Sequence, residues 1–230
     1  MTGNRGPARE RTAGGAGSRR RRGSGHQLRE VVLHAATELL AQLGDVDALT
    51  MRAVAAAAGV SAPSVYRHFP DKHTLVRAVI TDRFAEFTAT LQTAARDAGT
   101  RGGGPLEELE AIAHAYVEAG LARPGHYRVL FSATGAGPTG LGLDPDTAHP
   151  GAASFRALVG AVAACLPPAR HEDPSSPQTV LVLATELWAS LHGLVDLRIT
   201  KPEMPWPEPG PLIGWALEPV RSASRTEDLR

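Results

Sequence analysis

The chain has 230 residues, of which 43% are hydrophobic but only 5% aromatic, so a sizeable core must be built mainly from Ala, Leu and Val. That length exceeds one minimal helical domain and suits one small and one larger domain. The 24 basic and 24 acidic residues cancel, so the net charge alone favours no partner. The single cysteine, Cys165, excludes an internal disulfide and a zinc finger and favours the reducing cytoplasm.

The first 25 residues are of low complexity, rich in Gly and Ser, with seven arginines, four of them consecutive at 19–22. This segment has no apolar stretch for a signal peptide. It cannot bury apolar surface, so we expect a disordered arm at 1–25. Residues 1–68 hold ten basic and five acidic residues, whereas 69–230 hold fourteen and nineteen. A solvated tail and a basic arm that grips a DNA groove fit the segment equally well.

Regular structure is expected from about residue 26. Apolar residues recur at helical spacing through 28–43, and Gly44 ends that helix. Thr50 is a good cap for a short helix at 51–58. Gly59 ends this helix because glycine adopts a left-handed conformation at little cost.

A second short helix and a long one follow. Ser61 caps the short helix, and Pro63 sits in its first turn, where no hydrogen bond is lost. Residues 68–70 break it. Asp71 then caps a helix that runs to about residue 96 and would be nearly 40 Å long at about 1.5 Å per residue, enough to bridge two domains.

The remainder also has helical patterns and no convincing strand, so the sequence predicts an all-α protein. Loops rich in Gly and Pro separate helices expected at 105–122, 124–133, 152–166 and 177–200. Six prolines within 202–219 leave open whether a last helix forms near 212–220.

The segment 179–200 is the most apolar of the chain. Glu186, His192 and Asp196 interrupt it. We therefore expect a buried or interface helix rather than a membrane span.

Residues 50–69 read T-M-R-A-V-A-A-A-A-G-V-S-A-P-S-V-Y-R-H-F, two short helices joined by a G-V-S turn. This is the length of a helix-turn-helix. The alanines at 55–58 let the helices cross closely, Val60 plugs the crossing, and Val65 and Phe69 form the buried side of the second helix. The opposite face can enter a major groove about 12 Å wide, which predicts a DNA-binding module.

Residues 59–75 follow the pattern G-V-S-x-x-x-V-Y-R-H-F-x-D-K-x-x-L, and here the sequence resembles the tetracycline-repressor (TetR) family of bacterial transcription regulators. The resemblance extends upstream through 28–43 and 50–54. It implies a fold with an N-terminal three-helix helix-turn-helix domain and a C-terminal helical ligand-binding and dimerisation domain.

The resemblance also implies roles in DNA binding. The helix that starts at Thr50 meets phosphate, residues 61–64 lie against bases, and Tyr66, His68 and Lys72 bind phosphates. The complete predicted set is Thr50, Arg52, Ser61, Ala62, Pro63, Ser64, Tyr66, Arg67, His68 and Lys72. Two alternatives stay open: His68 only caps a helix end, and Tyr66 packs its ring inside.

The W-x-x-x-H-G sequence at 188–193 and R-P-G-H-Y-R-V-L-F at 123–131 are similar to a TetR subgroup with a WHG-type ligand domain. The expected ligand-binding residues are most of the large or amphipathic side chains of this part: Tyr116, Tyr127, Phe131, Phe155, Trp188 and His192. The alternatives are plain core packing for Trp188 and a histidine bonded to a backbone carbonyl for His192. The histidines are scattered without metal-ligand spacing, so we expect no metal and no cofactor.

Family members pair through their last two helices, which implies a homodimer held mainly by 179–200, with Trp206 and Trp215 contributing. Gly193 would allow a close helix crossing. The apolar surface expected at the interface comprises Val180, Leu183, Ala184, Leu187, Leu191, Leu194 and Val195. The alternative is that a single chain buries this surface.

These features predict a cytoplasmic repressor that an unknown small molecule releases from a palindromic double-stranded DNA operator. The expected division is an arm at 1–25, a helix-turn-helix domain at 26–72, an effector-binding and dimerisation domain at 73–222 and a tail at 223–230. Activation instead of repression stays open. An enzyme finds no support, because no nucleophile elbow, phosphate loop or metal spacing is present. An adaptor that does not bind DNA is disfavoured because the recognition helix is intact.

Overall fold

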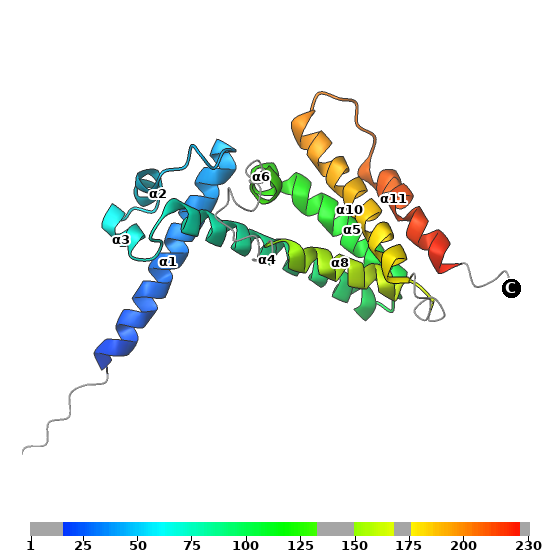
Figure 1. Cartoon of the computed structure of the whole chain (residues 1–230), viewed down its shortest axis with the longest axis horizontal. Coiled ribbons are helices and arrows are strands. Elements are labelled where there is room, and N and C mark those ends of the chain that lie inside the picture. The colour runs from blue at the N-terminus through cyan, green and yellow to red at the C-terminus, as the bar shows by residue number, and fades with distance from the viewer. Residues whose placement is uncertain (1–15, 133–149, 168–175, 226–230) are drawn as a thin grey trace, which may run out of the picture.

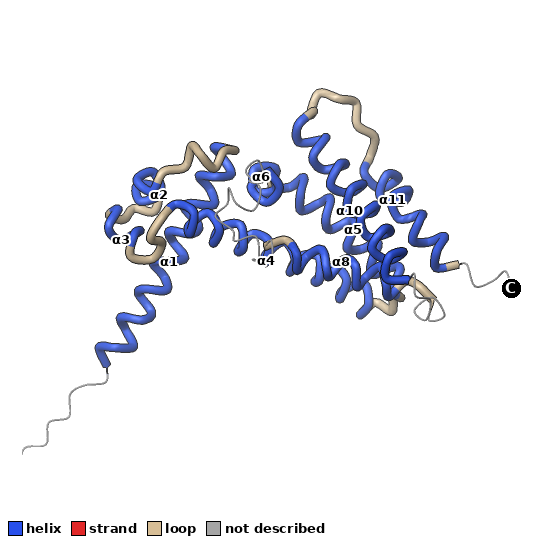
Figure 2. The backbone as a smooth tube through the Cα atoms, in the orientation of Figure 1, coloured by secondary structure: helices blue, strands red, loops and turns tan. Residues whose placement is uncertain are grey.

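The computed structural model describes residues 16–132, 150–167 and 176–225, and all regular elements in these ranges are helices (Figure 1, Figure 2). The all-α prediction is therefore confirmed. In chain order the helices are α1 (Ala16–Leu43), α2 (Met51–Ala57), α3 (Ala62–Tyr66), α4 (Lys72–Thr100), α5 (Pro105–Ala122), α6 (Pro124–Ser132), α8 (Ala152–Ala164), α10 (Ser176–Thr200) and α11 (Pro209–Ser224).

Helix α1 begins earlier than the sequence predicts. The backbone of residues 16–25, which the sequence assigns to the arm, continues the helix and projects away from the rest of the molecule (Figure 1). Arginine has a helix propensity close to that of leucine, and lengthening an existing helix avoids the cost of nucleation. Residues 1–15 lie outside the described ranges.

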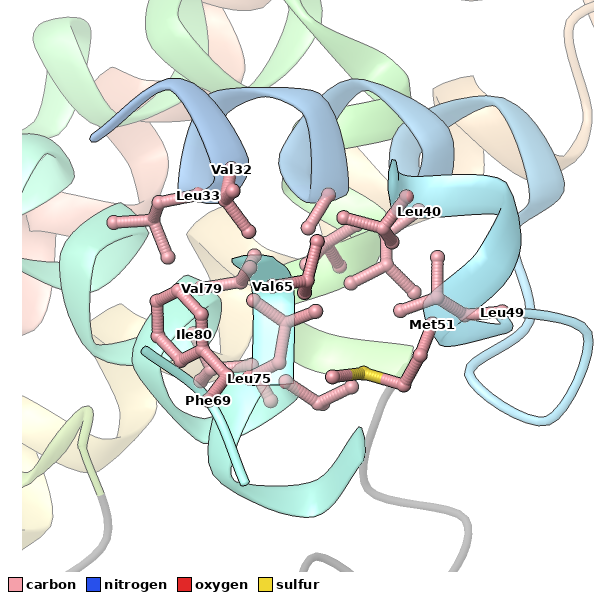
Figure 3. Packing of buried hydrophobic residues seen from close by; sticks show 14 of the residues in the cluster. Val32, Leu33, Leu40, Leu49, Met51, Val65, Phe69, Leu75, Val79 and Ile80 are labelled. Atoms are coloured by element: carbon pink, nitrogen blue, oxygen red, sulfur yellow. The ribbon is translucent and has the colours of Figure 1, made fainter. Parts of the chain in front are cut away.

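Helices α1 to α4 form the first domain around a common core (Figure 3). Val65 and Phe69 are buried, as the helix-turn-helix pattern predicts, against Val79 of α4 and its neighbours. The guanidinium group of Arg29 lies 5.2 Å from the centre of the Phe69 ring and covers it from the α1 side. Each large apolar side chain that leaves water here contributes about 1.5–3 kcal/mol.

The second domain contains α5, α6, α8, α10 and α11 packed against the C-terminal half of α4. Helix α11 settles the open question of the last helix: Pro209 stands in its first turn, where its missing N–H costs nothing. Pro219 lies within the helix but on its exposed side, while Leu217 and Val220 are buried.

Helix α4 connects the two domains (Figure 1). Its first half contributes Leu75, Val79 and Ile80 to the first core, and further along Leu91 packs against the second. Helix α6 adds a second connection, because Val129 and Leu130 belong to the first core while Tyr127 belongs to the second.

The surface of α10 expected at a dimer interface is largely used within the chain. Five of its seven residues are buried in this structure, and the other two, Leu183 and Leu194, pack partly buried against the same core. The alternative reading, burial within one chain, is therefore correct for this set. The sequence shows which residues share a helix face, but not which neighbour that face meets.

Within the chain, the close helix crossing lies at Gly120 and not at Gly193. A Cβ added at Gly193 would meet no atom within 4 Å, whereas one at Gly120 would lie 2.6 Å from Cγ1 of Val195 and 3.0 Å from the Tyr127 ring. Gly120 thus lets α5 approach α6 and α10.

Candidate functional sites

The helix-turn-helix is held by caps and by its turn. The Thr50 hydroxyl accepts a hydrogen bond from the Ala53 N–H at 3.1 Å. Gly59 adopts φ +66°, the left-handed conformation that ends α2. Ser61 stands at the cap position of α3, but its hydroxyl pairs with the Ser64 hydroxyl at 2.9 Å instead of a backbone N–H.

The face of α3 opposite Val65 is open to solvent. Tyr66 is 49% exposed, so the alternative that its ring packs inside is wrong. Thr50, Arg52, Ser61, Pro63 and Arg67 are also exposed, and Ala62, Ser64, His68 and Lys72 are half-buried. Arg67 donates to the Ser64 hydroxyl at 3.2 Å. All ten residues predicted to bind DNA are therefore exposed or half-buried, and they belong to α2, α3, the start of α4 or the residues that flank these helices.

Lys72 has partners that the sequence did not indicate. Its ammonium group donates to the carbonyl oxygens of Val46 and Asp47 at 3.1 and 3.3 Å. Its Nζ also lies 3.9 Å from the Asp47 carboxylate. Lys72 thereby ties the loop between α1 and α2 to the start of α4.

Asp71 caps α4 as predicted. The Thr74 N–H donates to its carboxylate at 2.7 Å, and this bond holds the pKa of the Asp71 carboxyl below its ordinary value. The cap fixes where α4 starts, directly after the recognition helix.

A cavity of about 940 Å³ lies in the second domain, between α4, α5, α6, α8 and α10. Five of the six residues predicted to bind a ligand line it: Tyr116, Phe131, Phe155, Trp188 and His192. Tyr127 is not one of the lining residues. It lies behind Phe131 and His192, and its ring packs against both. Trp188 packs against Phe155 with ring centres 5.6 Å apart and is 37% exposed, so it is not plain core packing.

Two tyrosines and a histidine form a hydrogen-bonded row beside the cavity. The hydroxyls of Tyr116 and Tyr127 are 2.9 Å apart, and the Tyr127 hydroxyl lies 2.7 Å from Nδ1 of His192. His192 thus meets a side-chain hydroxyl instead of the backbone carbonyl of the alternative reading.

Burial is the largest cause of the pKa shifts of these three side chains. It raises the pKa of Tyr116 to about 12, although hydrogen bonds to Tyr127 and Trp188 act in the opposite direction. Burial likewise raises the pKa of Tyr127 well above its ordinary value. Burial lowers the pKa of His192 more than the nearby Asp196 raises it. All three side chains are therefore neutral at pH 7.

Sequence reasoning missed the wall that α4 contributes. Phe84, Phe87, Leu91, Ala95 and Arg96 line the cavity at helical spacing, together with Glu108 and Ile112 of α5. Phe84, Phe87 and Leu91 recur at helical spacing in the sequence and therefore share one face of α4. This spacing does not distinguish a face that meets a filled core from one that meets a hollow, because that depends on how α8 and α10 are spaced across from it.

Within the described residues, no group of three or more His, Cys, Asp or Glu side chains is placed to hold a metal ion. Pro177–Thr200 is the one described stretch that is long and apolar enough to cross a membrane. Its buried side forms the core of the second domain, which is the position of a core helix.

An exposed helix-turn-helix joined by one long helix to a domain with an apolar cavity defines a DNA-binding regulator that responds to a ligand. Comparison of families agrees: the model of the bacterial regulatory proteins of the tetR family matches residues 32–79. The model of the tetracyclin repressor-like C-terminal domain, of the WHG type, matches residues 109–211. Together they match more than half of the chain, which belongs to the tetR family, a family of regulators and not of enzymes.

Solved structures with the same fold come from several bacteria. A candidate transcriptional regulator of Pseudomonas aeruginosa PAO1 is 20% identical with TM-score 0.68, covering 86% of this chain and 91% of its own. A Rhodococcus sp. RHA1 protein of unknown function is 26% identical with TM-score 0.58, covering 86% and 92%. SmeT, the repressor of the Stenotrophomonas maltophilia multidrug efflux pump SmeDEF, is 20% identical with TM-score 0.57, covering 85% and 89%. No curated protein sequence matches the chain.

Proposed function

We propose that this protein is a cytoplasmic repressor that binds a palindromic operator as a homodimer and is released when a small, mainly apolar molecule enters the cavity. The observation that carries this proposal is the course of α4. The helix is capped by Asp71, shortly after the recognition helix, and its residues from Phe84 to Arg96 form one wall of the cavity.

Because α4 lies beside the recognition helix and also lines the cavity, it can couple ligand binding to DNA binding. A ligand shifts an equilibrium only through its different affinity for the two states. A molecule that wedges between α4 and α8 favours a tilt of α4, and the packing of Val65 and Phe69 against Val79 carries that tilt to α3. Phe131 and Leu130 of α6 contact both the cavity and the first core, so α6 follows the same movement.

The DNA contacts are assigned to the surface of α2, α3 and the start of α4. Ser61, Ala62, Pro63 and Ser64 face the bases, and Ala62 and Pro63 offer only apolar contact, for example to a thymine methyl group. Thr50, Arg52, Tyr66, Arg67, His68 and Lys72 are assigned to phosphates. Lys72 would exchange its carbonyl partners for a phosphate oxygen or serve both.

A second copy of the chain is assigned to the outer face of α10. Val182, Ala189, Gly193 and Leu197 follow one another at helical spacing, and Val182 and Leu197 are each 45% exposed. On the neighbouring α11, Trp215 is 74% exposed. We call the four α10 residues the outer stripe. A twofold dimer through this stripe would place two recognition helices about 34 Å apart, in successive major grooves.

Repression is preferred to activation because the SmeT relative is a repressor of similar fold. The choice is tested by transcription in vitro from the protein's own promoter region. We expect the added protein to reduce the amount of transcript. An increase would show an activator.

DNA binding is tested by fluorescence anisotropy with a labelled palindrome from that promoter region, across a series of salt concentrations. Arg52→Ala removes an exposed charge from α2, and Arg156→Ala removes an exposed charge from α8 as a matched control. We expect Arg52→Ala to weaken binding to all duplexes and to lower the salt slope by about one. The Arg156→Ala control should bind like the unmodified protein. Equal behaviour of the two variants would contradict the assigned surface.

A further inference from the structure

We propose that the cavity binds an elongated, uncharged molecule with hydrogen-bonding groups along one long edge and an apolar opposite edge, and that the polar edge lies against Gln92 of α4. The inference rests on the proposed function in taking the cavity as the effector site. It goes further, because it names the chemical class of the effector and the direction in which the molecule is oriented between the helices.

Two rows of α4 side chains line the cavity. Residues four apart on a helix lie one above the other on the same side, so each row follows that spacing. The polar row contains Thr88, Gln92 and Arg96. The apolar row contains Phe87, Leu91 and Ala95. From Thr88 onward, this wall of the cavity therefore changes from polar to apolar across the width of the helix.

The neighbours of each row show which way it faces. The Thr88 hydroxyl lies 2.5 Å from the Ser154 hydroxyl, so the polar row faces α8. In the apolar row, the ring of Phe87 packs edge-to-face against Tyr116 of α5, with the ring centres 5.1 Å apart. Leu91 packs against the core of the second domain. The polar row thus borders the side of the cavity formed by α8, and the apolar row borders the side formed by α5.

The exposure of the lining residues distinguishes the same two sides. Gln92 and Arg96 are exposed, and so is Ala157 of α8. On the opposite side, Tyr116 and Leu191 are buried. A polar group of a ligand beside α8 therefore stays close to water. At the buried side the same group would lose water and meet mainly apolar surface, which is unfavourable.

Polar atoms on the buried side are paired behind the cavity wall. The Tyr116 hydroxyl lies 2.9 Å from the Tyr127 hydroxyl, which in turn lies 2.7 Å from Nδ1 of His192. Tyr127 does not line the cavity. The rings of Tyr116 and His192 are therefore what a ligand meets first on this side, and they suit the apolar edge of the molecule.

The polar row sets the chemistry of the polar edge. From Thr88 to Arg96 the row covers eight residues, which is about 12 Å at about 1.5 Å per residue. The carboxamide of Gln92, in the middle of the row, has both N–H donors and a carbonyl acceptor, so it can pair with a hydroxyl or a carbonyl group. At the outer end Arg96 and Glu108 carry opposite charges, so this end favours no net charge on the molecule.

Two isomers test this orientation with the full-length protein. Chrysazol is an anthracenediol with both hydroxyls on the same long edge, spaced by about one helical turn, roughly 5 Å. Its isomer rufol has the same atoms, but the hydroxyls lie on opposite long edges. Quenching of tryptophan fluorescence measures binding, since Trp188 lines the cavity. We expect chrysazol to bind roughly three- to tenfold more tightly than rufol, as one net hydrogen bond provides.

A pair of matched variants locates the group that selects the isomer. Gln92→Leu removes the carboxamide and should reduce the preference for chrysazol to about onefold. Gln178→Leu makes the same change at an exposed position of α10 that does not line the cavity, and this control should keep the preference. Both side chains are exposed, so both variants should fold, which circular dichroism and thermal unfolding establish.

A second readout reports contact with the polar edge directly. The side-chain amide of Gln92 gives a ¹⁵N–¹H NMR signal, which is identified by its loss in Gln92→Leu. We expect saturating chrysazol to shift this signal and to leave the side-chain amide signal of Gln178 unchanged. An unchanged Gln92 signal at saturation would contradict the inference.

Three further results would overturn it: rufol binding as tightly as chrysazol or more tightly, absence of binding by both up to their solubility, or a preference that survives in Gln92→Leu. None of these measurements involves DNA. If chrysazol is preferred and the protein binds no operator, the proposed function fails and the ligand class of the cavity stands. If the operator is bound and the isomers do not differ, only this inference fails.

Discussion

At the scale of single residues, Lys72 shows how one side chain can serve both the fold and a partner. Its position in the family pattern predicts a phosphate contact, and the structure shows it bonded to two carbonyl oxygens of the loop between α1 and α2. Both roles need a cation at the start of α4. Sequence alone reveals only the first, because carbonyl partners are not encoded by residue type.

Lys72→Met separates the two roles, since methionine keeps most of the apolar stem. We expect the free energy of unfolding to fall by about 1 kcal/mol, because the half-buried Val46 carbonyl and the exposed Asp47 carbonyl lose a donor. The salt slope of DNA binding should also fall by about one if the ammonium group meets a phosphate.

Thermal unfolding and anisotropy measure these two effects, with Lys201→Met as a control for loss of an exposed charge outside the DNA surface. A loss of stability with an unchanged salt slope would show that Lys72 only holds the loop.

The predicted ligand-binding residues show the same difference between what residue type indicates and what only the structure reveals. Tyr116, Trp188 and His192 were singled out as large amphipathic side chains, and the structure places them at one cavity. Tyr127 was predicted with them but stands one layer behind, hydrogen-bonded to His192. Residue type indicates which side chains suit a pocket. Their distance from the cavity surface depends on how α5, α6 and α10 pack.

At the scale of elements, the close approach of α5 to α10 depends on a glycine that the sequence did not single out. Gly120→Ala would bring a Cβ to 2.6 Å from Val195, so we expect a loss of about 1–3 kcal/mol in stability. Gly193→Ala meets nothing within 4 Å and should raise monomer stability by up to about 1 kcal/mol through helix propensity.

Chemical denaturation of both variants tests this pair. Equal midpoints would contradict the close crossing at Gly120. Because Gly193 lies in the outer stripe, its variant has a second readout. If the stripe is the dimer interface, Gly193→Ala should weaken self-association although the monomer is no less stable.

The N-terminal end of α1 is the second element whose behaviour can be tested. Deletion of residues 2–25 should weaken binding to operator and random DNA by similar factors and leave the fold intact, because the core of the first domain starts beyond this segment. The reason is the loss of the four arginines at 19–22, each of which can release a counterion from DNA.

Deletion of residues 2–15 is the matched control, since it spares those four arginines and should have a smaller effect. The measurement is anisotropy with operator and random duplexes. A loss of operator preference with unchanged affinity for random DNA would show that the segment reads sequence.

At the scale of the whole molecule, the structure changes which residues of α10 are expected at the dimer interface. The reason for expecting a dimer stays the same. Leu191 was expected at the interface, but it is 1% exposed and lines the cavity of its own chain. The outer stripe of α10 is what a second copy can reach. Leu197→Glu should therefore produce folded monomers with reduced operator affinity.

Sedimentation velocity at micromolar concentration tests this, with Leu191→Glu as a contrast that should unfold the chain because it buries a charge in the core. Folding is followed by circular dichroism. If the unmodified protein is a monomer at that concentration and still binds the operator tightly, the dimer proposal is wrong.

The sequence by itself determined the local structure and the family. Caps at Thr50 and Asp71 and the left-handed Gly59 act over a few residues, so the bounds of α2 and the start of α4 could be predicted closely. Pro105 likewise marks the first turn of α5, and the predicted and observed bounds of this helix agree. The helix-turn-helix was predictable for the same reason, since its residues lie within one short segment.

Only the tertiary structure decided which faces meet. The cavity wall of α4, the burial of Leu191 and the carbonyl partners of Lys72 each join residues far apart in the chain. A helical period places side chains on a common face, but the spacing between helices depends on the volumes of all side chains packed between them. Whether a face meets a core, a hollow or a second chain is therefore a property of the assembled fold.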